Sequence, residues 1–178
     1  MNILTINAGA SSIKFKIFRY HNKNKVTLLL SGQISHLKDK SALLVIRGNS
    51  EHSEKLSLNQ DNVYLSAIET LCLNNKFTQF SLDRVINRVV YGGKEYTDIV
   101  LLHSKTLANL SKYNMLAPLH QPYNLMIAEY LINTYPKIKH YATFDTGFHQ
   151  TIPLVNRAYA LPWKYTQDGI TRYGSYGL

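Results

Sequence analysis

The chain begins MNILTINAGASSIKFKIF (residues 1–18), in which two apolar segments flank a run of small residues. Apolar residues recur with a strand-like alternation in Ile3–Ile6 and again in Ile13–Phe18, which predicts two β-strands. Small residues fill the segment between them, Asn7–Ser12, and favour a turn. Strands joined this closely pair antiparallel, so we expect a hairpin at the start of a sheet.

The rest of the sequence extends the sheet and then adds helices. Further strands are expected at residues 26–35, 43–47, 52–58, 84–91 and 138–144. Helices are expected at residues 61–74, at 104–113 with Ser104 as N-cap, and from Pro122 to about Tyr135. Residues 153–165 are expected to form loop and short strand. Strands first, then alternating helix and strand, predict an α/β fold with a mixed sheet.

Composition predicts a folded protein in a reducing compartment. The 178 residues are 45% hydrophobic and 17% charged, which is not the balance of a disordered chain. The single cysteine, Cys72, lies between two leucines and is expected to be a small buried hydrophobe. The start lacks the regions of a signal peptide, and no apolar run reaches the roughly 20 residues of a spanning helix. A cytoplasmic location without a membrane partner is therefore expected.

The net charge of +9 raises the question of an acidic partner. No acidic residue precedes Asp39, whereas basic residues occur from Lys14 onward. A basic face attracts nucleotides, acidic metabolites or nucleic acid. The first lysines, however, alternate with Ile13, Phe15 and Ile17 in a strand pattern, and the sequence has no helix-turn-helix, zinc-knuckle or RNP-type motif. A nucleic-acid partner is therefore not expected.

Two segments have the residue types that bind phosphate and its metal ion. The turn Asn7–Ser12 leaves backbone N–H groups and hydroxyls free to approach phosphate oxygens, and Lys14 adds a positive charge beside it. A bare turn is the alternative. Asp145 follows the apolar strand at 138–144, where a carboxylate commonly holds Mg²⁺ or its waters. A capping or turn aspartate is the alternative there.

Arg88 and His120 are notable because of their neighbours. Arg88 has apolar residues on both sides in the strand at 84–91, so its guanidinium is either paired or directed into a ligand cleft. His120 lies between Pro118 and Pro122 in a rigid loop, and alone it would be interpreted as a structural histidine. Together with the two segments above, Arg88 and His120 form a combination that indicates more than either residue does alone.

Together, these segments resemble the acetate kinase family, which comprises acetate, propionate and butyrate kinases. The resemblance extends over residues 1–178 and rests on motifs in family order: NAGASSIK (7–14), RVVYGG (88–93), LAPLHQP (116–122), FDTGFHQTIP (144–153) and RYG (172–174). It implies the α/β, actin-like and sugar-kinase-like (ribonuclease H-like) mixed-sheet fold. It also implies ATP-dependent phosphoryl transfer to acetate or propionate, giving an acyl phosphate and ADP.

The resemblance implies roles for single residues on the acceptor side of such a site. Arg88 matches the arginine that holds the carboxylate and the transition state. Val90 and Leu119 match walls of the small apolar pocket that receives the acid. His120 matches a histidine near the transferred phosphoryl group, and Asp145 matches the catalytic aspartate.

On the nucleotide side, the resemblance implies that Lys14, with Ser11 and Ser12, contacts ATP, and that Asn7 is associated with Mg²⁺. The acceptor carboxylate has a pKa near that of glutamate, about 4.3, and is already ionised at neutral pH. It needs no base. Asp145 is therefore expected to position Mg²⁺ and water rather than to take a proton.

The chain departs from the family at several positions. Ala10 replaces a serine of the turn, Asn87 and Tyr91 replace histidines beside the arginine motif, and Gln121 replaces an asparagine. Tyr176 stands where the family has a histidine that stabilises the transition state. A neutral phenol cannot supply the positive charge of imidazolium.

Less than half of a family chain is matched. Residues 1–178 are expected to be a single N-terminal acetate-kinase-like domain, incomplete at its C-terminal end, without the second, nucleotide-binding domain. Because catalysis in this superfamily occurs in a cleft between two domains, little or no turnover is expected of this chain alone. The expected protein partner is a second copy or a full-length relative. The alternative function is a non-catalytic module that binds a short carboxylate, phosphate or a partner.

Overall fold

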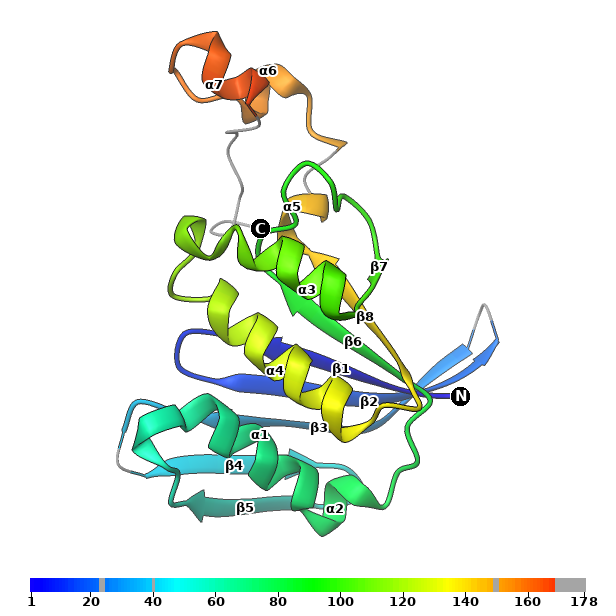
Figure 1. Ribbon diagram of the computed structural model, residues 1–178. Helices are drawn as coiled ribbons and strands as arrows, with labels where there is room; N and C mark the ends of the chain where they lie inside the picture. The colour runs from blue at the N-terminus through cyan, green and yellow to red at the C-terminus, as the bar shows by residue number, and fades with distance from the viewer. Residues whose placement is uncertain (23–24, 40, 149–150, 169–178) are drawn as a thin grey trace.

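The computed structural model describes residues 1–22, 25–39, 41–148 and 151–168. Its centre is a sheet with the strand order β5-β4-β3-β2-β1-β6-β8-β7 (Figure 1). The strands are β1 (Asn2–Ala8), β2 (Ile13–Asn22), β3 (Lys25–Ser35), β4 (Ala42–Arg47), β5 (Glu51–Leu56), β6 (Arg84–Val89), β7 (Val100–Leu101) and β8 (Lys139–Phe144).

The sheet is mixed, which confirms the predicted α/β class. β1 and β2 form the predicted antiparallel hairpin, with Ala8 opposite Ile13 at the turn. β6 runs parallel to β1 on one side and to β8 on the other. The other pairs of the described strands are antiparallel. Because β1, β6 and β8 run in the same direction, their carboxyl ends lie at one edge of the sheet.

Three helices, α1 (Val63–Leu73), α3 (Ser104–Ser111) and α4 (Gln121–Thr134), lie along one face of the sheet in Figure 1. The shorter elements are η1 (Gln60–Asn62), α2 (Asn75–Thr78), η2 (Asn114–Leu116), α5 (Asp145–Phe148), α6 (Leu154–Arg157) and α7 (Trp163–Gln167). Within the described ranges, no helix combines the length and the apolar character that crossing a bilayer requires.

Burial along the strands separates a covered face of the sheet from an open one. Leu4 and Ile6 of β1 are buried in the main core with residues of α1 and α4, and Phe15 of β2 joins them. The alternate residues Thr5 and Lys14 remain half-buried and exposed, respectively. A smaller cluster packs β6 and β8 against α3 and α4. Apolar burial on the helix side therefore holds the sheet, while the opposite face over β1 and β2 stays accessible.

Cys72 is buried in the main core, as predicted. Burial raises the pKa of its thiol to about 11, and a hydrogen bond with Tyr135 opposes this rise in part. The thiol is therefore protonated at neutral pH and serves as a packing group.

Several predicted boundaries were wrong. The N-cap of α3 is His103, whose side chain accepts from the Thr106 N–H at 3.3 Å, and Ser104 is the first residue of the helix. Residues 154–157 and 163–167 are helical where loop and strand were expected, because Pro153 and Pro162 precede them with φ of −52° and −49°. β6 ends before Tyr91, because the next two backbone N–H groups bond to side chains of α4.

Candidate active site

Three of the predicted side chains meet at the carboxyl edge of the parallel strands. Asn7 lies near the end of β1, Arg88 lies near the end of β6, and Asp145 directly follows β8. In open α/β sheets this edge is where ligands bind. The fold thus brings together residues that are 57 and 81 positions apart in the sequence.

Arg88 is the centre of this cluster. Its Nε donates to Asp145 Oδ1 at 2.8 Å, and its Nη2 donates to Asp145 Oδ2, so the pair is bidentate. Its Nη1 donates to Asn7 Oδ1 at 3.0 Å. The side chains of Arg88 and Asp145 are 32% and 18% exposed. The guanidinium is therefore paired and also open to a ligand, so both alternatives left by the sequence hold at once.

The hydrogen-bond capacity of Arg88 is only partly used. A guanidinium has five N–H donors, and the contacts with Asp145 and Asn7 occupy three of them. The other two have no partner among the described residues. A planar pair of charged donors suits a carboxylate or a phosphoryl group, which accepts two parallel hydrogen bonds.

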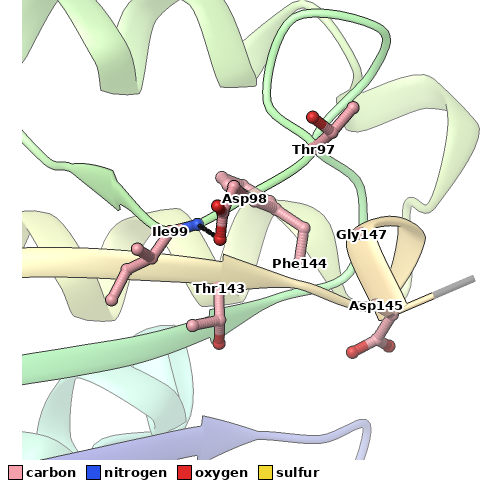
Figure 2. Close-up of a pocket in the computed structure, with 7 residues that line it drawn as sticks. All are labelled: Thr97, Asp98, Ile99, Thr143, Phe144, Asp145 and Gly147. Atoms are coloured by element: carbon pink, nitrogen blue, oxygen red, sulfur yellow. Dashed lines mark hydrogen bonds between the residues drawn. The ribbon is translucent and has the colours of Figure 1, made fainter. Parts of the chain in front are cut away.

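Two hollows lie on either side of the Arg88–Asp145 pair. One, of about 440 Å³, is on the open face of the sheet and is lined by Asn7, Lys14, Arg88 and Thr143 among others. The other, of about 410 Å³, is lined by Thr97, Asp98, Ile99, Thr143, Phe144, Asp145 and Gly147 (Figure 2). Figure 2 shows the Asp145 and Thr143 side chains pointing the same way, away from Thr97. A ligand in either hollow can thus reach the pair.

The turn after β1 lies beside the first hollow. Lys14 is exposed and stands opposite Asn7 in the β1–β2 ladder. The turn is closed by Gly9 N–H donating to the Ser12 carbonyl at 2.8 Å, and Ser11 is exposed within it. Ser11, Ser12 and Lys14 are thus on the loop and strand next to the cluster, and their contact with ATP stays a prediction.

His120, Val90 and Leu119 are not part of the cluster. His120 occupies the N-cap of α4 without a side-chain cap bond, and its buried Nδ1 has no hydrogen-bond partner among the described residues. Leu119 is 63% exposed, and neither Leu119 nor the half-buried Val90 lines either of the two hollows. The apolar acceptor pocket implied by the resemblance stays a prediction.

No role in the site was predicted for two buried amides that contact the site loops. Asn124 and Gln121 of α4 are 2% and 0% exposed. Gln121 accepts from Tyr91 N–H at 3.0 Å and donates to the Tyr91 carbonyl at 2.9 Å. Both are polar residues on a helix face whose other buried residues are apolar, and that contrast is the feature that could have identified them.

The described residues fit a magnesium ion that is shared with a nucleotide. Among them, no group of three or more histidine, cysteine and acidic side chains could hold a metal alone. Mg²⁺ commonly takes one or two carboxylates and completes its shell with phosphate oxygens and water. Asp145 offers a carboxylate and Asn7 offers an amide oxygen, and both groups accept hydrogen bonds from the Arg88 guanidinium.

Some residues with an expected role lie outside the described ranges. These are His149 and Gln150 of the fourth motif, the RYG motif at 172–174, and Tyr176.

Comparisons with known proteins show the family to which the chain is similar. The sequence profile of the Acetokinase family matches residues 2–178. The acetate kinase of Bacillus subtilis (strain 168) is 33% identical over 183 residues, covering 98% of this chain and 45% of that protein. The acetate kinase of Rickettsia felis is 34% identical over 185 residues, covering 99% and 45%. The chain thus spans less than half the length of the curated relatives it matches.

Solved structures share the fold of this chain. A propionate kinase from Francisella tularensis superposes with a TM-score of 0.79 at 27% identity, covering 97% of this chain and 44% of that one. The acetate kinase of Porphyromonas gingivalis superposes with a TM-score of 0.77 at 26% identity, covering 97% and 44%. The expected fold, that of the first domain of such kinases, is confirmed.

Proposed function

The chain belongs to the Acetokinase family, and from that premise we propose that it forms the acceptor-binding part of an ATP-dependent kinase for acetate or propionate. The observation that carries the proposal is the Arg88 guanidinium, held by Asp145 and Asn7 at the carboxyl edge of the sheet with two N–H donors to spare. The product of the reaction would be an acyl phosphate, with ADP as the leaving group.

The proposed chemistry uses Arg88 as an electrostatic clamp. The acceptor carboxylate is an anion, the γ-phosphoryl group is an anion, and bringing them together is unfavourable without a positive charge between them. Arg88 bonds to both in turn: it first orients the carboxylate oxygen, and then it neutralises charge on the equatorial phosphoryl oxygens. The oxygen–phosphorus bond to the acid forms as the bond to the β-phosphate oxygen breaks.

Asp145 and Asn7 would have two tasks. In the free protein they hold the guanidinium in one orientation, so that less conformational entropy is lost when the anion binds. They are also the residues that would hold Mg²⁺, which would neutralise phosphate charge when bound. Lys14, across the hairpin from Asn7, would bond to the phosphate chain of ATP as a point charge.

We further propose that this chain binds the acyl phosphate but turns it over poorly alone. The cluster opens onto an uncovered sheet face, and the matched relatives are more than twice as long as the aligned region. Phosphoryl transfer needs a site from which water is excluded. A non-catalytic module that binds a short carboxylate or phosphate is the alternative, and it shares the binding step.

Calorimetric titration of the 178-residue chain with acetyl phosphate in the presence of Mg²⁺ tests the proposal. We expect saturable binding that weakens about tenfold, or about 1.4 kcal/mol, in Arg88→Lys, because lysine cannot form the paired hydrogen bonds. The matched control is Arg84→Lys on the same strand, where the arginine bonds to the Asp83 carbonyl. Absence of binding by the wild type, or equal effects of the two variants, would refute the proposal.

A further inference from the structure

The backbone ladder between β1 and β6 ends before it reaches the candidate site. The parallel register runs from Ile3 opposite Arg84 to Ile6 opposite Asn87. Asn7 and Arg88 are the next residues on their strands, and no ladder pair joins them. Yet their side chains lie 3.0 Å apart, from Asn7 Oδ1 to Arg88 Nη1. Something else must hold the two strand ends at this spacing.

Asn124 of α4 bridges the strand ends just beyond the ladder. Its Nδ2 donates to the Ala8 carbonyl at 2.8 Å, and Ala8 is the residue after Asn7. Its Oδ1 accepts from the Val90 N–H at 3.2 Å, and Val90 lies two residues after Arg88. The Asn124 side chain thus donates a hydrogen bond to β1 and accepts one from the segment that follows β6.

The chemistry of this bridge suits an amide. A carbonyl on one side needs a donor and an N–H on the other side needs an acceptor, and the side-chain amide of asparagine or glutamine offers both from one planar group. Asn124 is 2% exposed, so a lost hydrogen bond would leave a buried polar group without compensation. Gln121, one turn earlier on α4, holds both polar groups of the Tyr91 backbone in the same way.

We propose that Asn124 is a positioning residue that sets the spacing of Asn7 and Arg88. It is too deeply buried to touch a ligand, and it acts through the two strand ends. The inference rests on the proposed function only in taking Asn7 and Arg88 as partners in one site. Loss of the bridge would separate Asn7 from Arg88, whereas the Arg88–Asp145 pair would persist, because the β6–β8 ladder continues to Val89 opposite Phe144.

Nuclear magnetic resonance of the ligand-free, 178-residue chain tests this difference. The probes are the side-chain amide signals of Asn7, assigned with Asn7→Ala, and the Arg88 Nε–H signal, assigned with Arg88→Lys. In Asn124→Asp, studied at a pH at which the new carboxyl group is ionised, the carboxylate can still accept from Val90 but cannot donate to Ala8. We expect the Asn7 amide signals to move toward those of an exposed asparagine while the Arg88 Nε–H signal changes little. The control Asn133→Asp makes the same change at an exposed position of α4.

Unchanged Asn7 signals in a folded Asn124→Asp variant would overturn the proposal, as would equal changes in Asn133→Asp. If Asn124→Asp does not fold, Asn124→Ser, which is too short to bridge both groups, takes its place. If Asn124→Ser does not fold either, hydrogen exchange of the Val90 N–H in the wild type tests whether the bridge exists. A protected Val90 N–H supports the bridge, and exchange at the rate of an exposed amide refutes it.

The same variants keep the inference separate from the proposed function. If the wild type binds acetyl phosphate, Asn124→Asp should bind it about tenfold more weakly and Asn133→Asp as tightly as the wild type. If the wild type does not bind it, the proposed function fails, but the ligand-free spectra still decide whether Asn124 sets the geometry.

Discussion

At the scale of single residues, Arg88 is a half-buried arginine in a largely apolar strand with an anion already beside it. The bidentate contact with Asp145 compensates much of the cost of burying its charge. The same contact fixes the plane of the guanidinium, so a stabilising pair is also a preorganised receptor. A ligand would add to this arrangement rather than replace it, because two N–H donors remain.

Asp145→Asn separates the structural and the metal-binding tasks of the carboxylate. Asparagine keeps the shape but loses the charge, so we expect Mg²⁺ to strengthen acetyl phosphate binding in the wild type and to have no effect in the variant. The loss of the counter-ion should also lower the free energy of unfolding by about 1–3 kcal/mol. Calorimetry with and without Mg²⁺ measures the binding of acetyl phosphate, and urea unfolding measures the free energy of unfolding.

Asp98→Asn is the matched control for this prediction. Asp98 lines the neighbouring hollow, and its carboxylate accepts from the Ile99 N–H at 2.7 Å (Figure 2). It should keep the effect of Mg²⁺ on binding. A retained Mg²⁺ effect in Asp145→Asn would contradict a metal role for Asp145.

Arg88 and Asp145 could be singled out in the sequence because each contrasts with its surroundings, whereas Asn7 was assigned through the family resemblance. An arginine in a largely apolar strand and an aspartate at the end of an apolar strand are local contrasts. Asn124 could not be found in this way, since its task depends on Ala8, 116 positions away, and on where a ladder ends. Such information is absent from any short window of the sequence.

At the scale of elements, the turn after β1 is held by a helix as well as by its own backbone. The Tyr64 hydroxyl of α1 donates to the Ala10 carbonyl at 2.8 Å and contacts the Gly9 carbonyl at 3.2 Å. Burial raises the pKa of Tyr64 above its ordinary value, so the hydroxyl stays protonated and able to donate. Its ring stacks on Tyr123 of α4, with centroids 4.1 Å apart.

Tyr64→Phe should therefore destabilise the chain and loosen the turn. We expect the free energy of unfolding to fall by about 0.5–1.5 kcal/mol, the net contribution of such a hydrogen bond. Tyr123→Phe is the control, because it keeps the stacked ring and removes a hydroxyl that has no hydrogen-bond partner among the described residues. Urea denaturation measures both, and equal losses would show that the contacts with the turn carry no stability.

His140 of β8 gives the stability of the fold a dependence on pH. The ring is buried, Nε2 lies 3.0 Å from the Tyr135 carbonyl, and Nδ1 has no partner among the described residues. Burial lowers the pKa of His140, and the bond to Tyr135 opposes this in part. Below about pH 6.5 the histidine of the unfolded chain binds a proton, whereas the buried ring in the folded chain stays neutral. The free energy of unfolding therefore decreases as the pH is lowered, until the lowered pKa of the folded state is reached.

His140→Gln should flatten this dependence, because glutamine can still donate to Tyr135 but does not titrate. The measurement is the free energy of unfolding in urea at pH 7.5 and at pH 5.5. His21→Gln, at an exposed histidine beside Thr27, should leave the slope unchanged. If His140→Gln does not reduce the change in the free energy of unfolding between the two pH values, His140 is not the source of the pH dependence.

The elements that the sequence predicted well are those with a local signal. The β1–β2 hairpin follows from alternation on both sides of a short turn, and α1 follows from apolar spacing. The helices at 154–157 and 163–167 were missed because each is a single turn, too short for a period to show. The end of β6 was missed because side chains from α4 determine it.

At the scale of the whole molecule, the sheet is covered by helices on one face and open over the candidate site on the other. The curated relatives are matched over 45% of their length. We expect acyl-phosphate-dependent ATP formation by the 178-residue chain to be at or near background, because water has access to the cluster. A luciferase assay with acetyl phosphate and Mg²⁺–ADP measures it. Turnover that Asp145→Asn abolishes and Asp98→Asn retains would show that this chain suffices.

Arg88, held by Asp145 and Asn7, is proposed to be the group that receives the acyl phosphate. A crystal structure of the 178-residue chain with acetyl phosphate and Mg²⁺ would locate the ligand. We expect an oxygen of the ligand within hydrogen-bond distance of Arg88 Nη1 or Nη2, with Asp145 still on Nε. Acetyl phosphate bound elsewhere on the chain, or an Arg88 without a ligand at saturating concentration, would contradict it.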